Sequence, residues 1–115
     1  MPGVDADLDL GKLSELAELL GTERTAIVRT LVTELTAALA RIDRGLAGGD
    51  LSEVAAAAHA ARNSALMIDA QPLLRVLKQL ETCARRDEPE GASAARSRLD
   101  GVWPPLRSKL ELAAR

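Results

Sequence analysis

Apolar residues recur every three or four positions along almost the whole chain, and this spacing constrains the fold more than any other feature of the sequence. It is the spacing of residues that share one face of an α-helix. No stretch shows the strict alternation of apolar and polar residues that is typical of a β-strand. The pattern is interrupted at segments that contain glycine or proline, which commonly end helices. We expect helices over about residues 9–20, 23–47, 51–68, 71–86 and 91–114.

The amino-acid composition favours the same fold class. Only 1% of the residues are aromatic, and Trp103 is the one aromatic side chain. A core without rings has to bring its elements close together, which alanine-rich helices can do because small side chains shorten the distance between helix axes. We expect the first helix to lie over one end of the other four. The sequence therefore predicts a single all-α domain over residues 1–115, an up-and-down four-helix bundle with a short N-terminal lid helix.

Two segments near the C-terminus are predicted to interrupt the helices. Residues 87–91 are polar and contain both a proline and a glycine, so we expect a loop there. Pro104 and Pro105 lack the backbone N–H and clash with the preceding turn of a helix. They predict a kink or a short break near residues 101–105.

Charge and cysteine content exclude several classes of protein. The net charge of -2, without a strongly basic face, argues against nucleic acid as the main partner. Cys83 is the single cysteine, so neither an intrachain disulfide nor a four-cysteine zinc site is possible. No apolar run approaches the ~20 residues of a membrane span, and the N-terminus lacks the pattern of a signal peptide. These observations predict a cytoplasmic protein that does not bind membranes.

The single histidine, His59, lies in the middle of the third predicted helix. Arg62 follows three residues later and Asn63 four residues later, so the three side chains share one patch of the helix surface. At ~100° per residue, His59 is on the order of 130° from the centre of the core-facing set, and its ring is expected to point away from the core. An outward imidazole beside a fixed cation is equipped to accept a phosphoryl group.

The run from His59 to Ala65 resembles the motif of histidine-containing phosphotransfer domains, which is His, two residues, Lys or Arg, Gly and then small polar residues. The similarity continues without a gap to Leu80 and Glu81 on the next helix. Asn63 differs from the motif, because the family usually has Gly at that position. The flanking residues 13–21 and 46–50 also resemble the family's leading helix and its Gly-Asp turn.

The resemblance implies that His59 is the phosphoacceptor and that Arg62 stabilises the phosphoryl charge. Glu81 and Arg85 match positions where the family often has polar side chains near the histidine. Glu81 is a candidate acceptor for the second imidazole nitrogen, but the simpler interpretation of both residues is a surface charge. Asn63 and Ser64 are further candidates beside the histidine. The expected apolar docking surface consists of Ala55, Ala56, Leu66 and Met67.

These roles describe a monomeric phosphohistidine carrier rather than an enzyme that turns over small molecules. Its expected partners are the receiver domain of a response regulator, a hybrid histidine kinase, or both. The chain needs no cofactor or metal of its own, since Mg²⁺ is expected on the receiver domain. Two alternatives remain open. The same bundle can bind receiver domains as an adaptor or inhibitor, with Asn63 blocking their approach, or it is a purely structural helical module.

Overall fold

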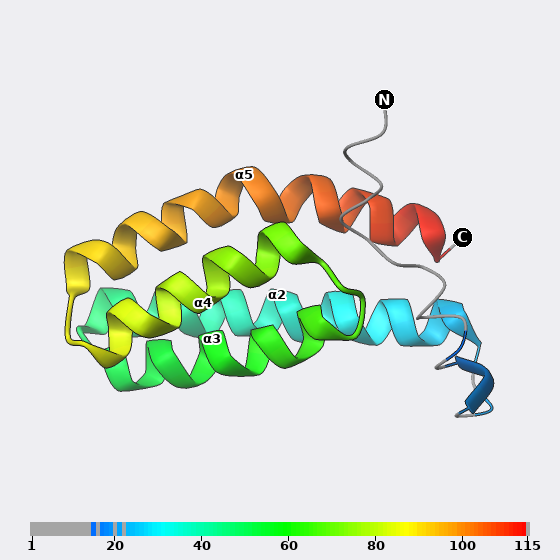
Figure 1. Ribbon diagram of the computed structural model, residues 1–115, viewed down its shortest axis with the longest axis horizontal. Coiled ribbons are helices and arrows are strands. Elements are labelled where there is room, and N and C mark those ends of the chain that lie inside the picture. The colour runs from blue at the N-terminus through cyan, green and yellow to red at the C-terminus, as the bar shows by residue number, and fades with distance from the viewer. Residues whose placement is uncertain (1–14, 16, 20, 22, 115) are drawn as a thin grey trace.

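Four helices run along the long axis of the molecule in the computed structural model, which describes residues 15, 17–19, 21 and 23–114 (Figure 1). Successive helices are antiparallel, so the predicted all-α, up-and-down bundle is confirmed. Within the predicted leading helix, residues 15 and 17–19 are helical, and the remainder of that helix and its role as a lid lie outside the described residues. The four helices are α2 (Arg24–Gly48), α3 (Leu51–Leu66), α4 (Gln71–Arg85) and α5 (Pro89–Ala113).

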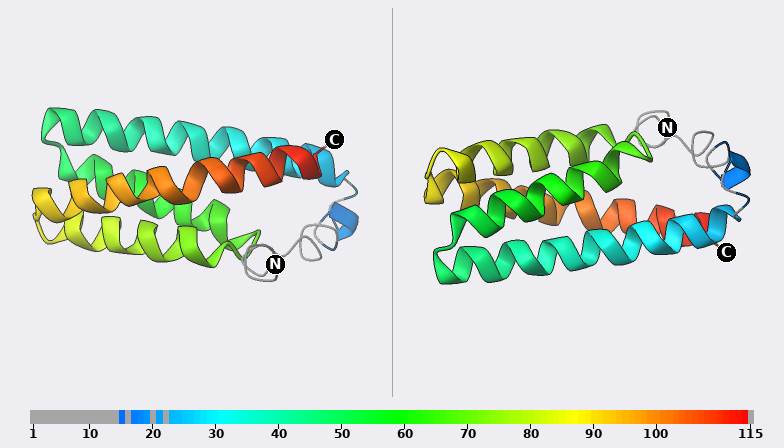
Figure 2. Two further views of the ribbon diagram at one scale, coloured as in Figure 1. Left: turned by 90° about the horizontal axis from the view of Figure 1, so that it is seen from above. Right: turned by 90° about the horizontal axis from the view of Figure 1, so that it is seen from below.

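The helices α3 and α5 lie diagonally opposite each other in the bundle. Both pack against α2 and α4. Figure 2 shows the consequence: α5 is in front when the molecule is seen from above, and α3 is in front when it is seen from below. One face of α3 is therefore open to solvent between its two neighbours.

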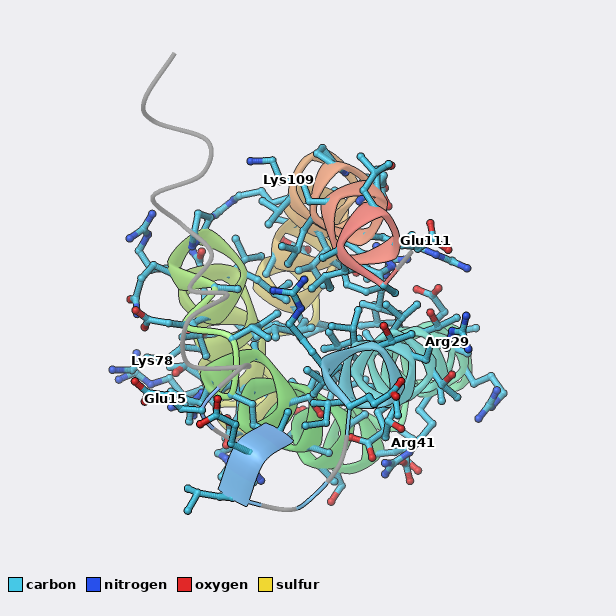
Figure 3. All side chains as sticks on the ribbon, turned by 90° about the vertical axis from the view of Figure 1, so that its right-hand side faces the viewer. Glu15, Arg29, Arg41, Lys78, Lys109 and Glu111 are labelled. Carbon is cyan, nitrogen blue, oxygen red and sulfur yellow. The ribbon has the colours of Figure 1, made fainter. Side chains whose placement is uncertain are left out.

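Aliphatic side chains and alanines fill the space between the helices. The end view in Figure 3 shows the charged side chains of Arg29, Lys78 and Lys109 on the outside of the bundle. In α3, alanine supplies most of the buried face, which lets this helix approach its neighbours closely. The buried apolar residues of the described ranges form a single cluster. Its largest fully buried side chains are Leu31, Leu35, Ile42, Ile68, Leu73, Leu77, Leu80, Leu99, Leu110, Val28 and Val54.

A short turn reverses the chain between α2 and α3. Gly49 ends α2 in the left-handed conformation, with φ of 70°, which glycine adopts without strain. The side chain of Asp50 then accepts a hydrogen bond from the backbone N–H of Glu53 and caps the start of α3. These two residues fix the point at which the helix that carries His59 begins.

The helix α5 begins earlier than predicted. Pro89 is its first residue, a position where the missing N–H costs no hydrogen bond. The expected loop over residues 87–91 is therefore wrong in its second half. The chain reverses instead at Asp87, which adopts a left-handed conformation with φ of 58°.

Of the two outcomes predicted near residues 101–105, a kink or a short break, the break is wrong. The helix α5 continues without interruption through Pro104 and Pro105 (Figure 1). Leu99 and Leu110, one on each side of the prolines, are fully buried and hold both halves of the helix against the core. Such packing contributes more to the stability of a helix than local propensity does. The carbonyl groups that lose their donors belong to exposed residues, where water can replace the missing N–H groups.

Candidate functional site

The imidazole of His59 stands on the open face of α3. Its side chain is 55% exposed, while Ala58 and Ala61 beside it in the sequence are buried. The helix places it there because the buried residues of α3 fall on the opposite side at helical spacing. The outward orientation agrees with the prediction from the sequence.

Glu81 of α4 brings three basic side chains together beneath the ring. Its Oε2 lies 3.2 Å from Nδ1 of His59. The same oxygen accepts hydrogen bonds from Nε and Nη2 of Arg85 at 2.9 and 2.7 Å. Its Oε1 accepts a hydrogen bond of 2.7 Å from Nη1 of Arg62. We refer to these four residues as the Glu81 cluster.

The carboxylate at the centre of this cluster is buried. The side chain of Glu81 is 8% exposed, so the prediction of a surface charge at this position is wrong. The sequence does contain a signal for its burial, because Glu81 follows Leu77 by four residues and therefore falls on the core-facing side of α4. A carboxylate at such a position needs charged partners, and Arg62 and Arg85 provide them.

Burial and the two arginines act on the Glu81 carboxyl in opposite directions. Burial is the larger single effect and would raise its pKa. The hydrogen bonds from Arg62 and Arg85, together with their charges, outweigh burial and leave the pKa of Glu81 below its ordinary value of 4.5. The carboxyl is therefore ionised at neutral pH.

The ionised carboxylate determines the tautomer of His59. A carboxylate can only accept hydrogen bonds, so the ring nitrogen that faces it, Nδ1, carries the proton. The lone pair of the neutral ring then lies on Nε2. The two nitrogens lie on different edges of the ring, so Nε2 points away from Glu81. The arrangement presents a nucleophilic nitrogen on an exposed and oriented side chain.

Arg62 lies deeper in the structure than a solvated surface charge. Its side chain is 30% exposed, and its Nε is buried without a hydrogen-bond partner in the described part of the chain. Arg85 is more accessible, with 58% of its side chain exposed. The structure thus brings Arg62, Glu81 and Arg85 into one cluster with His59, although they come from two helices.

The other predicted residues lie around this cluster or apart from it. Asn63, Ala56, Leu66 and Met67 are exposed on α3 and the turn after it. Ser64 is buried and donates a hydrogen bond of 3.0 Å to Glu34 on α2, so it points away from Glu81. Ala55 differs from the prediction of a docking residue, because it is only 4% exposed.

A hollow of about 540 Å³ lies between the first half of α3 and the end of α4. It begins one helical turn before His59, where Ala55 and Ala56 form part of its wall, and Arg85 of the Glu81 cluster lines it from α4. This hollow depends on the way two helix ends meet, so it cannot be predicted from the pattern of either helix alone. Its remaining lining residues are Leu51, Ser52, Ala84 and Asp87.

Neither a metal site nor a membrane span is apparent in the described ranges. No group of three or more His, Cys, Asp and Glu side chains gathers there in a way that would hold a metal ion. None of the helices described is both long and apolar enough to cross a lipid bilayer.

Comparison with known proteins identifies the family. The sequence model of the Hpt domain matches residues 26–113, which includes all of α3, α4 and α5 and nearly all of α2. Comparisons with curated proteins and with solved structures gave no match. Hpt domains are helical bundles that act in phosphotransfer in two-component signalling and interact with receiver and kinase domains. The open face of α3 with its oriented histidine is consistent with the match over residues 26–113. The chain belongs to the Hpt domain family.

Proposed function

We propose that this chain is a phosphorelay intermediate that accepts a phosphoryl group on His59 from an aspartate of one receiver domain and donates it to another. One observation carries the proposal: an exposed imidazole whose Nδ1 faces a buried, ionised carboxylate. Such a ring keeps Nε2 free to react. Membership of the Hpt domain family supports the same function.

In the accepting step, the lone pair of Nε2 attacks phosphorus and forms an N–P bond. The P–O bond to the aspartate breaks, and its electron pair stays on the aspartate oxygen. The ring becomes positively charged, because Nδ1 keeps its proton, and the carboxylate of Glu81 stabilises that charge. Arg62 and Arg85 supply positive charge that favours the negative phosphoryl oxygens. The donating step is the reverse of this reaction.

The partner must cover His59 for this reaction to occur. We expect the Mg²⁺ of the reaction on the receiver domain, and a hybrid histidine kinase is a second candidate partner. The docking surface comprises Ala56, Leu66 and Met67, with Ala55 contributing only to the wall of the hollow. We further propose that the chain acts as a monomer in the cytoplasm.

Transfer from a labelled receiver domain tests the function. Receiver domains charged with radiolabelled acetyl phosphate are incubated with the wild-type chain and with His59→Gln. The proposal predicts a label on the wild-type chain that is stable in alkali and lost in acid, and none on the variant. His59 is the only histidine, so a label that persists in His59→Gln would refute the assignment.

The position of Asn63 favours a second candidate, a bundle that binds receiver domains without transferring phosphate. Asn63 is exposed one helical turn after His59, where the family usually has Gly. A side chain there can hold a partner away from the ring. If it does, Asn63→Gly accelerates transfer severalfold. An unchanged rate in Asn63→Gly would remove this steric argument, and tight binding of receiver domains without any label would favour the adaptor.

A further inference from the structure

The two arginines of the Glu81 cluster differ in their accessibility and in the oxygen they bind. Arg62 makes one hydrogen bond, to Oε1, and its Nε is sealed from solvent. Arg85 makes two hydrogen bonds to Oε2, the oxygen that also faces His59, and its side chain is about twice as exposed. The two cations therefore cannot respond to a phosphoryl group on the ring in the same way.

The loss of Arg85 and the loss of Arg62 would leave different hydrogen-bond donors on the two oxygens of the Glu81 carboxylate. If Arg85 turns away, Oε2 keeps the Nδ1–H of His59 and Oε1 keeps Arg62, so each oxygen retains a donor. If Arg62 turns away, Oε1 loses its donor while the other oxygen still has His59 and Arg85. A buried acceptor without a donor is costly, so the cluster loses less when Arg85 is the residue that moves.

The hollow beside His59 gives Arg85 room to move. Side chains on a helix lean toward its N-terminus, so the ring of His59 leans toward the turn that contains Ala55 and Ala56. Those two residues line the hollow together with Arg85. We therefore expect a phosphoryl group on Nε2 to lie near this hollow, which Arg85 lines from α4.

We propose that Arg85 is the residue that contacts the phosphoryl group on His59, and that Arg62 is a positioning residue that stays bound to Glu81. This division of roles rests on the proposed function, since it requires a phosphoryl group on Nε2. It differs from the role that the sequence resemblance implies for Arg62. Arg85 exchanges its two bonds to Oε2 for charge-assisted bonds to phosphoryl oxygens, and the carboxylate keeps one donor on each oxygen.

Chemical phosphorylation tests the proposal without any partner protein. Phosphoramidate is used as the donor for the wild-type chain and for Arg62→Gln and Arg85→Gln. Arg86→Gln is the matched control, because it removes an exposed arginine at the next position of the chain. The rate of labelling and, after removal of the donor, the half-life of the phosphohistidine are measured for each. Arg62→Lys and Arg85→Lys keep the charge and serve as second variants in case a glutamine variant fails to fold.

We expect Arg85→Gln to shorten the half-life about tenfold, since a charge-assisted hydrogen bond is lost, and Arg85→Lys to restore most of it. Arg62→Gln is expected to slow labelling more than it shortens the half-life, because the ring loses its orientation. Arg86→Gln should behave as the wild type. A half-life that falls equally in both glutamine variants, falls more in Arg62→Gln, or falls in neither overturns the division of roles. A label that survives in His59→Gln instead overturns the proposed function.

An NMR measurement distinguishes an arginine that contacts the phosphoryl group directly from one that affects the phosphohistidine indirectly. The N–H signals of the arginine side chains are followed by NMR before and after phosphorylation, and the lysine variants identify each signal. We expect the Arg85 signal to move strongly and the Arg62 signal to move less. The opposite pattern would assign the phosphoryl contact to Arg62.

Discussion

Glu81 holds a negative charge almost out of contact with water, and its three partners explain how it can do so. Arg62 and Arg85 outweigh the cost of burial and keep the carboxyl ionised. The ionised carboxylate then fixes which nitrogen of His59 carries the proton. One buried side chain thus sets both the tautomer and the orientation of the exposed ring.

The lowered pKa of Glu81 makes stability depend on pH in a defined direction. Folding favours its ionised form, so its contribution to the free energy of unfolding is complete above the ordinary pKa of 4.5 and is lost as the pH falls through the lower pKa of the folded state. We expect the wild-type chain to lose stability in acid more steeply than Glu81→Gln. Urea unfolding at a series of pH values between neutral and strongly acidic conditions measures the difference.

The control for this experiment is Glu111→Gln, which removes an exposed carboxylate from α5. Its pH dependence should follow that of the wild type. If Glu81→Gln and Glu111→Gln have equal slopes in acid, the carboxylate of Glu81 is not the group that links folding to pH.

Sequence reasoning was sufficient for His59 and insufficient for Glu81. The outward direction of His59 follows from the periodicity of its own helix, which is local information. The contact between His59 and Glu81 joins residues that are 22 positions apart, and it depends on the register between α3 and α4. The register is set by the packing of the whole bundle, so the spacing of residues within α4 can indicate that Glu81 is buried but not that it contacts His59.

At the scale of the elements, α2 and α3 approach each other closely where α2 ends. Gly45 lies on the buried side of the last turn of α2. A Cβ atom on Gly45 would lie 2.7 Å from Cγ2 of Val54 and 3.1 Å from the carbonyl oxygen of Asp50. Val54 is fully buried and cannot turn aside, so the absence of a side chain at Gly45 permits the close contact.

We therefore expect Gly45→Ala to destabilise the protein. Alanine has the higher helix propensity by about 1 kcal/mol, but overpacking a core typically costs about 1–3 kcal/mol. The net loss should be on the order of 1 kcal/mol in the free energy of urea unfolding. Gly48→Ala is the matched control in the same helix, because a Cβ atom there meets no atom within 4 Å. Equal effects of the two substitutions would contradict the packing argument.

In the helix α5, packing against the core outweighs the local tendency of proline to interrupt a helix. Two consecutive prolines predict a kink or a short break, and α5 has no break. In this bundle, Leu99 and Leu110 anchor the segments before and after the prolines in the same core. The burial of side chains on both sides of the two prolines is a property of the folded bundle. It cannot be predicted from the sequence of this segment alone.

At the scale of the whole molecule, the described helices share one core rather than two. The buried apolar residues of α2, α3, α4 and α5 belong to a single cluster, and Trp103 of α5 is part of it. Small domains with one core usually unfold in a single cooperative step. The bundle is therefore expected to lose all of its helices together.

Trp103 allows this expectation to be measured, because it is the only tryptophan. Its fluorescence reports on the core next to α5, and far-UV circular dichroism reports on all helices. We expect the two urea-unfolding curves to have the same midpoint and the same slope. An earlier fluorescence transition would mean that α5 separates before the other helices unfold.

The four residues of the Glu81 cluster all come from two neighbouring helices. His59 and Arg62 come from α3, and Glu81 and Arg85 come from α4, so a single helical hairpin contains the whole cluster. The helices α2 and α5 support this hairpin from behind and contribute no member to the cluster. The outer faces of these two helices are therefore open to redesign, for example to attach a reporter or a tether, while the hairpin that contains the cluster is kept intact.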